Sequence, residues 1–376
     1  MNKSTQSNRR QLFSLGTLVL MVPALRHFVT ASAKYAGRAT WLTPLIAALP
    51  MLLYLHFLAD FMDCRREGEN LQELMLRCLG PKLGRGALAL TAAWLLLYSG
   101  FVLRSGADRM IITIYPNSSP AAFTVAMGLV CLVAALGKPR TIIRCARLIK
   151  PIVLAALLLI LFFALSSAKS SNLLPITVND ALPAALGSLA AVNVLLVGVY
   201  TLCFVEGQCP VSPGRAKESS LWLLWAVLLL CLLTTAITGM FGAELTAKMN
   251  WPFFVMVRNL VFFRTVERVE ALVAMLWLFP DFLLASLLLW SAQHCLRLVF
   301  RFDAAYYGEK ALDQRQGRWL VWPCTLAVIV CSLFIGRSAQ DMELWSAQII
   351  PVLNMGFALL FLPAVYIIGK LKKTVL

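Results

Sequence analysis

Long runs of apolar residues, separated by short polar segments, follow one another along the chain. A bilayer accepts apolar helices in runs of about 20 residues, so ten such runs predict ten membrane-spanning helices. Because a backbone in lipid must satisfy its own hydrogen bonds, we expect an all-α polytopic bundle. The expected spans are residues 11–31, 41–61, 86–107, 120–137, 149–167, 184–205, 221–242, 269–296, 319–336 and 346–369.

The composition supports a single membrane domain over residues 1–376. Apolar residues make up 60% of the 376 positions and charged residues only 14%, which is more apolar surface than a soluble domain of this size can bury. The ten spans divide into five plus five, over residues 11–167 and 184–369. This division predicts a transporter fold built from two inverted repeats.

In such folds the first helix of each repeat is broken near the middle of the membrane. Span 11–31 carries Gly16 and Pro23, and span 184–205 carries Gly187, Asn193 and Gly198. Both are candidates for broken helices. The alternative is that Gly and Pro are simply common in membrane helices.

The distribution of cations predicts the orientation. With the N-terminus inside, the inner loops carry more than twice as many Lys and Arg as the outer loops, so both termini should be cytoplasmic. The net charge of +16 comes from cations that flank the spans, which argues against nucleic acid as a partner. Segment 138–150 has five cations and no acid, and anionic lipid of the inner leaflet is its expected partner.

Two segments between spans predict short helices at the membrane surfaces. Residues 69–83 place apolar side chains at three- and four-residue spacing, which predicts an amphipathic helix on the cytoplasmic face that ends at Gly80-Pro81. Residues 251–263 mix aromatic side chains with Arg258 and suit a helix on the outer surface.

Ionisable and polar residues inside spans are costly and therefore candidates for function. Arg26 and His27 lie near the outer end of the first span, where they either line an extracellular vestibule or extend to the interface. Arg26 could meet a carboxylate. Asn193 lies deeper in the sixth span and either contacts a polar ligand or bonds a neighbouring helix.

Two carboxylates complete the set of substrate or ion candidates. Glu206 closes the sixth span and is either a ligand that faces the inner cavity or an ordinary carboxylate at a helix end. Asp281 follows Pro280 about halfway along the eighth span. A carboxylate at that depth is a paired buried charge, a protonated acid, or part of an ion or substrate site.

A charged cluster begins the eighth span. Glu267 and Glu270 are three residues apart and share a helix face, Arg268 lies between them, and Trp277 follows seven residues after Glu270. The cluster is either a charged gate over the pore or a helix start with surface ion pairs.

The sequence lacks the patterns that carry enzyme chemistry. It contains no GxSxG, HExxH or phosphate-loop motif and only three His, and its ten Cys form no CxxC pair. We therefore expect no enzyme activity, no metal site and no cofactor.

Several of these motifs together resemble the spore germination permeases. The resemblance rests on Trp251-Pro252, on the run Glu267-Arg268-Val269-Glu270 followed by Trp277, and on the segments AGRATWLTPLIA (36–47) and SNLLPI (171–176). It extends from about residue 11 to the end. The chain departs from the family pattern in the sixth span, where Gly198-Val199 stands in place of a Gly-Glu pair.

The resemblance implies the B subunit of a nutrient germinant receptor, related to the amino acid–polyamine–organocation transporters. Such a subunit would lie in the inner spore membrane with a larger membrane subunit and a lipoprotein. It would sense or pass a small nutrient of the amino acid class, which we expect to bind between spans 1, 3, 6 and 8. The alternatives are an amino acid/cation secondary transporter that acts alone and a scaffold without a ligand.

Overall fold

The computed structural model describes residues 9–115, 117–209, 215–260, 269–307, 314–336 and 338–372, and no strand occurs in these ranges. The α-helices are α1 (Arg9–Pro23), α2 (Val29–Ala36), α3 (Thr43–Asp63), α4 (Leu71–Leu79), α5 (Pro81–Thr113), α6 (Pro120–Leu136), α7 (Pro139–Ser166), α8 (Ala181–Cys203), α9 (Arg215–Phe241), α10 (Ala243–Thr246), α11 (Pro252–Asn259), α13 (Val269–Val299), α14 (Ala304–Tyr307), α15 (Gln314–Trp319), α16 (Val321–Phe334), α17 (Ala339–Leu344), α18 (Ile350–Met355) and α19 (Leu362–Leu371).

The prediction of an all-helical integral membrane protein is confirmed. In the described ranges, eight helical segments are long and apolar enough to cross a bilayer. One of them, Arg9–Asp63, contains both the first and the second predicted span, and the shorter apolar helix Pro120–Leu136 corresponds to the fourth. The count of ten spans and the division into two five-helix repeats stay predictions.

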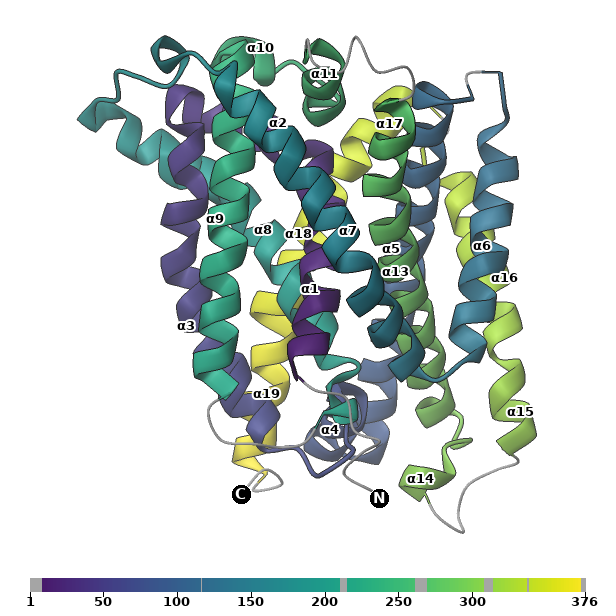
Figure 1. Ribbon diagram of the computed structural model, residues 1–376. Helices are drawn as coiled ribbons and strands as arrows, with labels where there is room; N and C mark the ends of the chain where they lie inside the picture. Colours follow the sequence, from purple (N-terminus) through teal and green to yellow (C-terminus); the bar gives the residue numbers. More distant parts are fainter. Residues whose placement is uncertain are drawn as a thin grey trace.

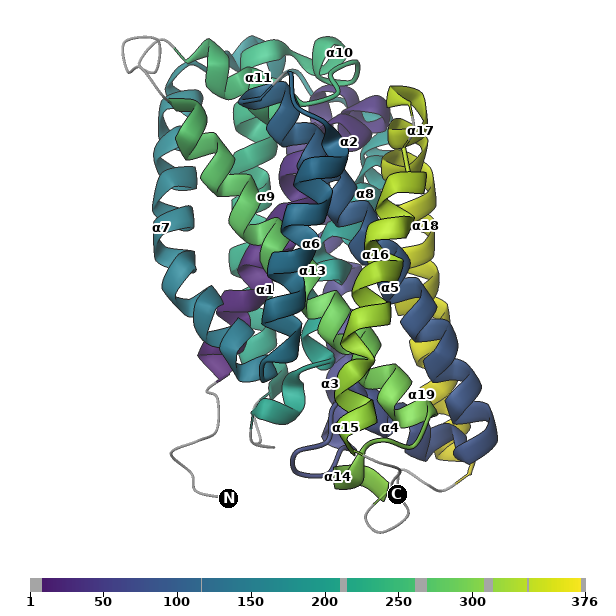
Figure 2. The same ribbon diagram turned by 90° about the vertical axis from the view of Figure 1, so that its right-hand side faces the viewer.

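The helices form an upright bundle with short elements at both ends. Helix α4 and the end of α19 lie at one end of the bundle, and α10 and α11 lie at the other (Figure 1). Figure 2 shows α7 at one edge of the bundle and α16 and α18 at the opposite edge. Helices α5 and α13 pack along each other, while α1, α2 and α3 pack on α8.

The predicted break in the sixth span is wrong, because α8 runs continuously through Asn193 and Gly198. Its glycines allow close helix packing instead. A Cβ atom at Gly187 would meet the Cβ of Ala36 at 2.8 Å and the carbonyl oxygen of Ser32 at 2.9 Å. A Cβ at Gly198 would lie 3.2 Å from the Cβ of Leu20. The glycines therefore bring α1 and α2 against α8.

The first span is distorted after Pro23 rather than broken. The chain passes from α1 through the π-helical segment η2 (Ala24–Phe28) into α2. A second π-helical segment, η8 (Trp345–Ile349), joins α17 to α18 and is followed by Pro351. Proline cannot donate the helical hydrogen bond and its ring clashes with the preceding turn, which explains the widened turn η8 before Pro351. The segment η2 instead begins directly after Pro23.

Helix α4 confirms the predicted helix before Gly80 but lies deeper than expected. Its apolar side chains, including Leu71, Leu74 and Met75, are fully buried against the end of the bundle. The helix packs on α5, α13 and α19. Gly80 has a φ of 82°, a conformation that favours glycine, and so ends α4 sharply before α5 begins.

Candidate functional site

A cavity of about 380 Å³ lies between η2 and α2, the middle of α5, the first half of α8, and η8 with α18. Its volume lies at the lower end of the range for small-molecule sites. Apolar side chains form most of the wall. The polar side chains that line it are Arg26, His27, Tyr35, Tyr98, Asn193, Ser346 and Asn354.

Three of the five predicted candidates share this cavity. Arg26 and His27 come from η2, and Asn193 comes from α8, where it is 7% exposed. The Nε and Nη2 atoms of Arg26 and the Oδ1 atom of Asn193 are buried and meet no hydrogen-bond partner among the described residues. The side chains of Arg26 and Asn193 thus have unused hydrogen-bonding capacity beside the cavity, and their role in binding stays a prediction.

Asn354 forms the opposite side of the cavity. It is completely buried, and its Oδ1 accepts a 2.6 Å hydrogen bond from the hydroxyl of Tyr200. This bond leaves its Nδ2 without a partner in the described part of the chain. Sequence reasoning missed Asn354, although an Asn three residues after a proline within an apolar span was the signal that could have identified it.

Asp281 does not line the cavity. It is 2% exposed and forms an ion pair with Arg109 of α5, so it is the paired buried charge among the three readings of the sequence.

The residues that line the cavity come from spans 1, 3, 6 and 10, with η8 and α18 in the place expected for span 8. Arg109 lies beyond the predicted span 86–107, but α5 continues to Thr113 and holds it in the bundle.

Aromatic side chains connect the ion pair to the edge of the cavity. The guanidinium carbon of Arg109 lies 5.4 Å from the centre of a Trp277 ring. Trp251 lies between Trp277 and His27, with ring centres 6.5 Å and 5.4 Å away. Trp277, the last residue of the predicted gate cluster, thus packs beside Arg109. Glu267, Arg268 and the side chain of Glu270 lie outside the described residues.

A second pocket, of about 240 Å³, adjoins the cavity at His27. Its polar wall includes Arg104 and Asp108, which form an ion pair with a distance of 3.1 Å. Glu343 also lines this pocket and lies 3.4 Å from Lys34 of α2. The pocket connects the cavity wall with the end of the bundle that carries α10 and α11.

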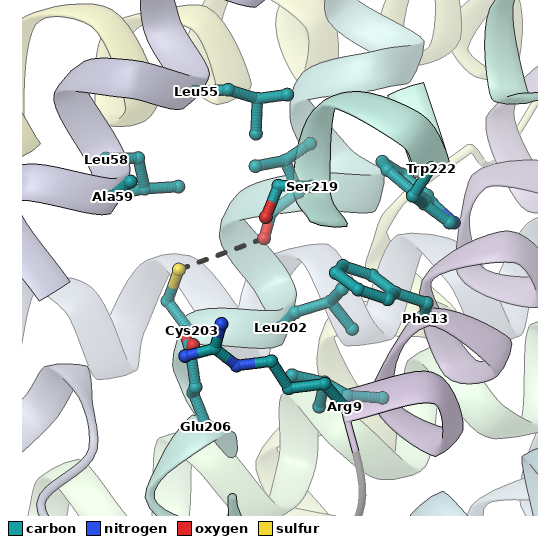
Figure 3. A pocket seen from close by; sticks show the side chains of 12 residues that line it. Arg9, Phe13, Leu55, Leu58, Ala59, Leu202, Cys203, Glu206, Ser219 and Trp222 are labelled. Atoms are coloured by element: carbon teal, nitrogen blue, oxygen red, sulfur yellow. Dashed lines mark hydrogen bonds between the residues drawn. The ribbon is translucent and has the colours of Figure 1, made fainter. Parts of the chain in front are cut away.

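Glu206 lies at the other end of α8, away from the cavity. It is 4% exposed and lines a pocket of only about 40 Å³ with Arg9, Phe13 and Trp222 (Figure 3). The Sγ of Cys203 donates a weak 3.9 Å hydrogen bond within this site, to the carbonyl oxygen of Val199. The space holds water-sized molecules only, so Glu206 and the cavity residues do not form one site.

The described residues contain no group of three or more His, Cys, Asp or Glu side chains placed to hold a metal ion. The chemistry of the cavity is thus that of a binding site with one guanidinium, one imidazole, two amides and hydroxyl groups. These groups bind a polar ligand through hydrogen bonds and charge.

Comparison with known families decides the affiliation of the chain. The family model described as "Spore germination protein" matches residues 8–340. The chain belongs to the spore germination protein family. The resemblance identified in the sequence is thereby confirmed, and with it a permease of the membrane rather than a family of enzymes. A search of curated protein sequences found no match.

Solved structures show that the fold is that of transporters. Mhp1, a nucleobase-cation-symport-1 family transporter in a closed conformation with bromovinylhydantoin bound, matches with a TM-score of 0.63 at 13% identity. The match covers 97% of this chain and 84% of that chain. MhsT in complex with L-phenylalanine matches with a TM-score of 0.58 at 16% identity, over 95% and 89%.

Proposed function

We propose that this spore germination permease is the membrane subunit of a nutrient germinant receptor and binds a small nutrient in the cavity of about 380 Å³. The single observation that carries the proposal is that Arg26, Asn193 and Asn354, each with a buried polar atom that meets no partner in the described part of the chain, line that cavity together. Buried polar groups are normally satisfied, so three unsatisfied groups around one space argue for a ligand. Family membership supports the role in germination.

The proposal includes the assembly and the location. We place the chain in the inner spore membrane, beside a larger membrane subunit and a lipoprotein, with both termini cytoplasmic. The first part of α7 supports the orientation, because Lys138, Arg144 and Arg147 are exposed there and form a cationic surface. Such a surface attracts the anionic lipid of a cytoplasmic leaflet.

The remaining candidates have separate roles in this proposal. Nutrient binding in the cavity involves Asn193 and His27, while Asp281 holds Arg109 beside the cavity wall. Glu206 contributes to closure of the end of α8, where the space is too small for a nutrient. The binding energy of the nutrient would then favour one conformation of the bundle over another.

Germination of spores that lack the gene tests the proposal. We expect loss of the response to one class of nutrients, restored by the wild-type chain but not by Asn193→Leu, which removes a cavity amide. Asn259→Leu is the matched control, because Asn259 is exposed on α11. Normal germination of the deletion strain with every nutrient would contradict the receptor proposal.

A secondary transporter that acts alone is the second candidate function, because both similar structures are transporter folds. Uptake of a nutrient by the purified chain in liposomes would favour it. A requirement for the two partner subunits would favour the receptor.

A further inference from the structure

Arg26 is a buried cation whose donors are not used. Its side chain is 4% exposed, and the described residues offer no hydrogen-bond acceptor to its Nε and Nη2 atoms. Its guanidinium carbon lies 4.5 Å from the centre of the Phe101 ring. A stacked aromatic ring supports a guanidinium but leaves the in-plane N–H groups available. Arg26 also forms part of the cavity wall, so its guanidinium lies beside the ligand space.

The nearby carboxylates already have cationic partners. Asp281 forms its ion pair with Arg109, and Asp108 forms its ion pair with Arg104. No Asp or Glu occurs among the described residues that line the cavity. Arg26 therefore has no ion pair of its own among the described residues, although Asp281 and Asp108 still act on its charge. A buried charge without a close partner is costly.

The rest of the wall suits an apolar body. Leu189, Val194, Ile350, Pro351 and Met355 line the cavity together with the rings of Tyr98 and Phe101. The cavity reaches the surface at Tyr35 and Val352, which are 63% and 66% exposed. One cationic group in a mostly apolar space matches a ligand with one anionic group and a hydrocarbon body.

We propose that the ligand of this cavity is a small organic carboxylate whose anionic group is held by Arg26 and whose recognition does not require an ammonium group. This inference rests on the proposed function and sharpens it. A carboxylate accepts two parallel hydrogen bonds from a guanidinium, which fixes both its position and its orientation. The amides of Asn193 and Asn354 complete the polar contacts.

A zwitterionic amino acid fits the same site less well. Its ammonium group would enter a space that already contains the charge of Arg26, and the described lining offers this group no carboxylate. The carboxylate of the zwitterion can pair with Arg26, but its ammonium group then stays in the cavity without an anionic partner. Electrostatic interactions are stronger beside a buried group such as Arg26 than in water, and the deaminated acid is therefore the better ligand.

A set of molecules related to leucine separates these contributions. The purified full-length chain in nanodiscs is titrated calorimetrically with 4-methylpentanoate, L-leucine, 4-methylpentanamide and 3-methylbutylamine. These four share their branched hydrocarbon end and differ in charge. We expect 4-methylpentanoate to bind at least about tenfold more tightly than L-leucine, and the amide and the amine to bind more weakly still. Carboxylates from acetate to octanoate define the size, and chloride and phosphate test inorganic anions.

Variants of Arg26 assign the effect to this side chain. Arg26→Gln should weaken the binding of 4-methylpentanoate at least about tenfold, and Arg26→Lys should retain part of the affinity. The matched control is Arg38→Gln, which changes an exposed arginine outside the cavity and should bind like the wild type. The ranking of the four molecules on the wild-type chain needs no variant to fold.

Several outcomes would overturn the inference. The inference is wrong if L-leucine or 3-methylbutylamine binds as tightly as 4-methylpentanoate, although the cavity would then still be a nutrient site. It is also wrong if folded Arg26→Gln binds the carboxylate as tightly as the wild type, if only inorganic anions bind, or if no carboxylate binds. The germination response of Asn193→Leu spores then decides separately on the proposed function.

Discussion

The guanidinium of Arg109 on α5 and the carboxylate of Asp281 on α13 form an ion pair from which solvent is almost completely excluded, with the side chains 1% and 3% exposed. Gly106 lies directly beside this pair, since a Cβ there would come within 3.0 Å of an Asp281 oxygen. The absence of a side chain at residue 106 therefore lets α5 and α13 approach closely enough for the pair to form.

Removing one partner of this pair should destabilise the protein strongly. Asp281→Asn leaves the charge of Arg109 buried without its carboxylate, and the expected loss is about 3–5 kcal/mol of unfolding free energy. Denaturant titration in detergent measures it. Asp108→Asn is the control, because its pair with Arg104 is partly exposed and should contribute about 0–1 kcal/mol. Equal losses in the two variants would contradict the importance of burial.

A methyl group at the crossing of α2 and α8 should also destabilise the bundle. Gly187→Ala places a Cβ within 2.9 Å of the carbonyl oxygen of Ser32, which belongs to backbone and cannot rotate away. We expect a loss of about 1–3 kcal/mol, read from the thermal unfolding transition.

Gly86→Ala is the matched control for this crossing. Gly86 is a helical glycine of α5, and a methyl group added there would have no neighbouring atom within 4 Å, so the substitution should stabilise by about 0.4–1 kcal/mol. The same sign of change at both positions would refute the assignment of Gly187 to helix packing.

The contact between α4 and α13 should weaken in acid. Burial alone would raise the pKa of Glu73, but His294, whose Nε2 lies 2.5 Å from the carboxylate, and two backbone hydrogen bonds outweigh it and lower this pKa below the ordinary 4.5. Asp303 and Arg297 lie beside the same histidine. A lowered pKa means that the stabilisation is present above about pH 4.5 and is lost as the pH falls through the native value.

Substitution of Glu73 tests the pH effect. Glu73→Gln should lower the stability at neutral pH by about 1–3 kcal/mol and should reduce the further loss of stability in acid. Thermal unfolding across a pH series, compared with the wild type, measures both. Parallel curves for the two proteins would mean that Glu73 does not cause the acid sensitivity.

Asn70 should contribute more than an ordinary helix cap. It precedes α4 in a capping box with Glu73, and its Oδ1 also accepts a 2.9 Å hydrogen bond from the backbone of Gly207 after α8. Asn70→Ala removes the cap and leaves this buried N–H unpaired, so we expect a loss of about 2–3 kcal/mol. Ser119→Ala, which removes only the cap of α6, should cost about 1 kcal/mol in the same denaturant titration.

The sequence predicted the helices well because hydropathy determines them directly. It also identified Arg26, His27 and Asn193, since polar side chains stand out within apolar spans, and the structure brings these three to one cavity. It could not pair Asp281 with Arg109, because the predicted span ended at residue 107 and left Asp108 and Arg109 outside it. The four-residue spacing of Arg104 and Asp108, which form an ion pair on one helix face, was the missed signal.

The sequence did not predict that span 10 forms part of the cavity wall. Residues 346–355 read as one more apolar helix, and apart from Asn354 nothing in their composition distinguishes a cavity wall from a surface that faces lipid. Contacts that are distant in sequence, such as Tyr200 with Asn354, decide which helix faces inward. Such contacts depend on the packing of the whole bundle and leave no local pattern.

The part of the cavity wall that span 10 forms lies outside the region that the family model matches. The family match ends at residue 340, whereas Ser346, Ile350 and Asn354 lie beyond it. The shared pattern thus covers the side of the cavity that carries Arg26 and Asn193 but not the side that faces them. A substitution in the last membrane helix would therefore change the shape of the ligand space in this chain and leave Arg26 and Asn193 in place.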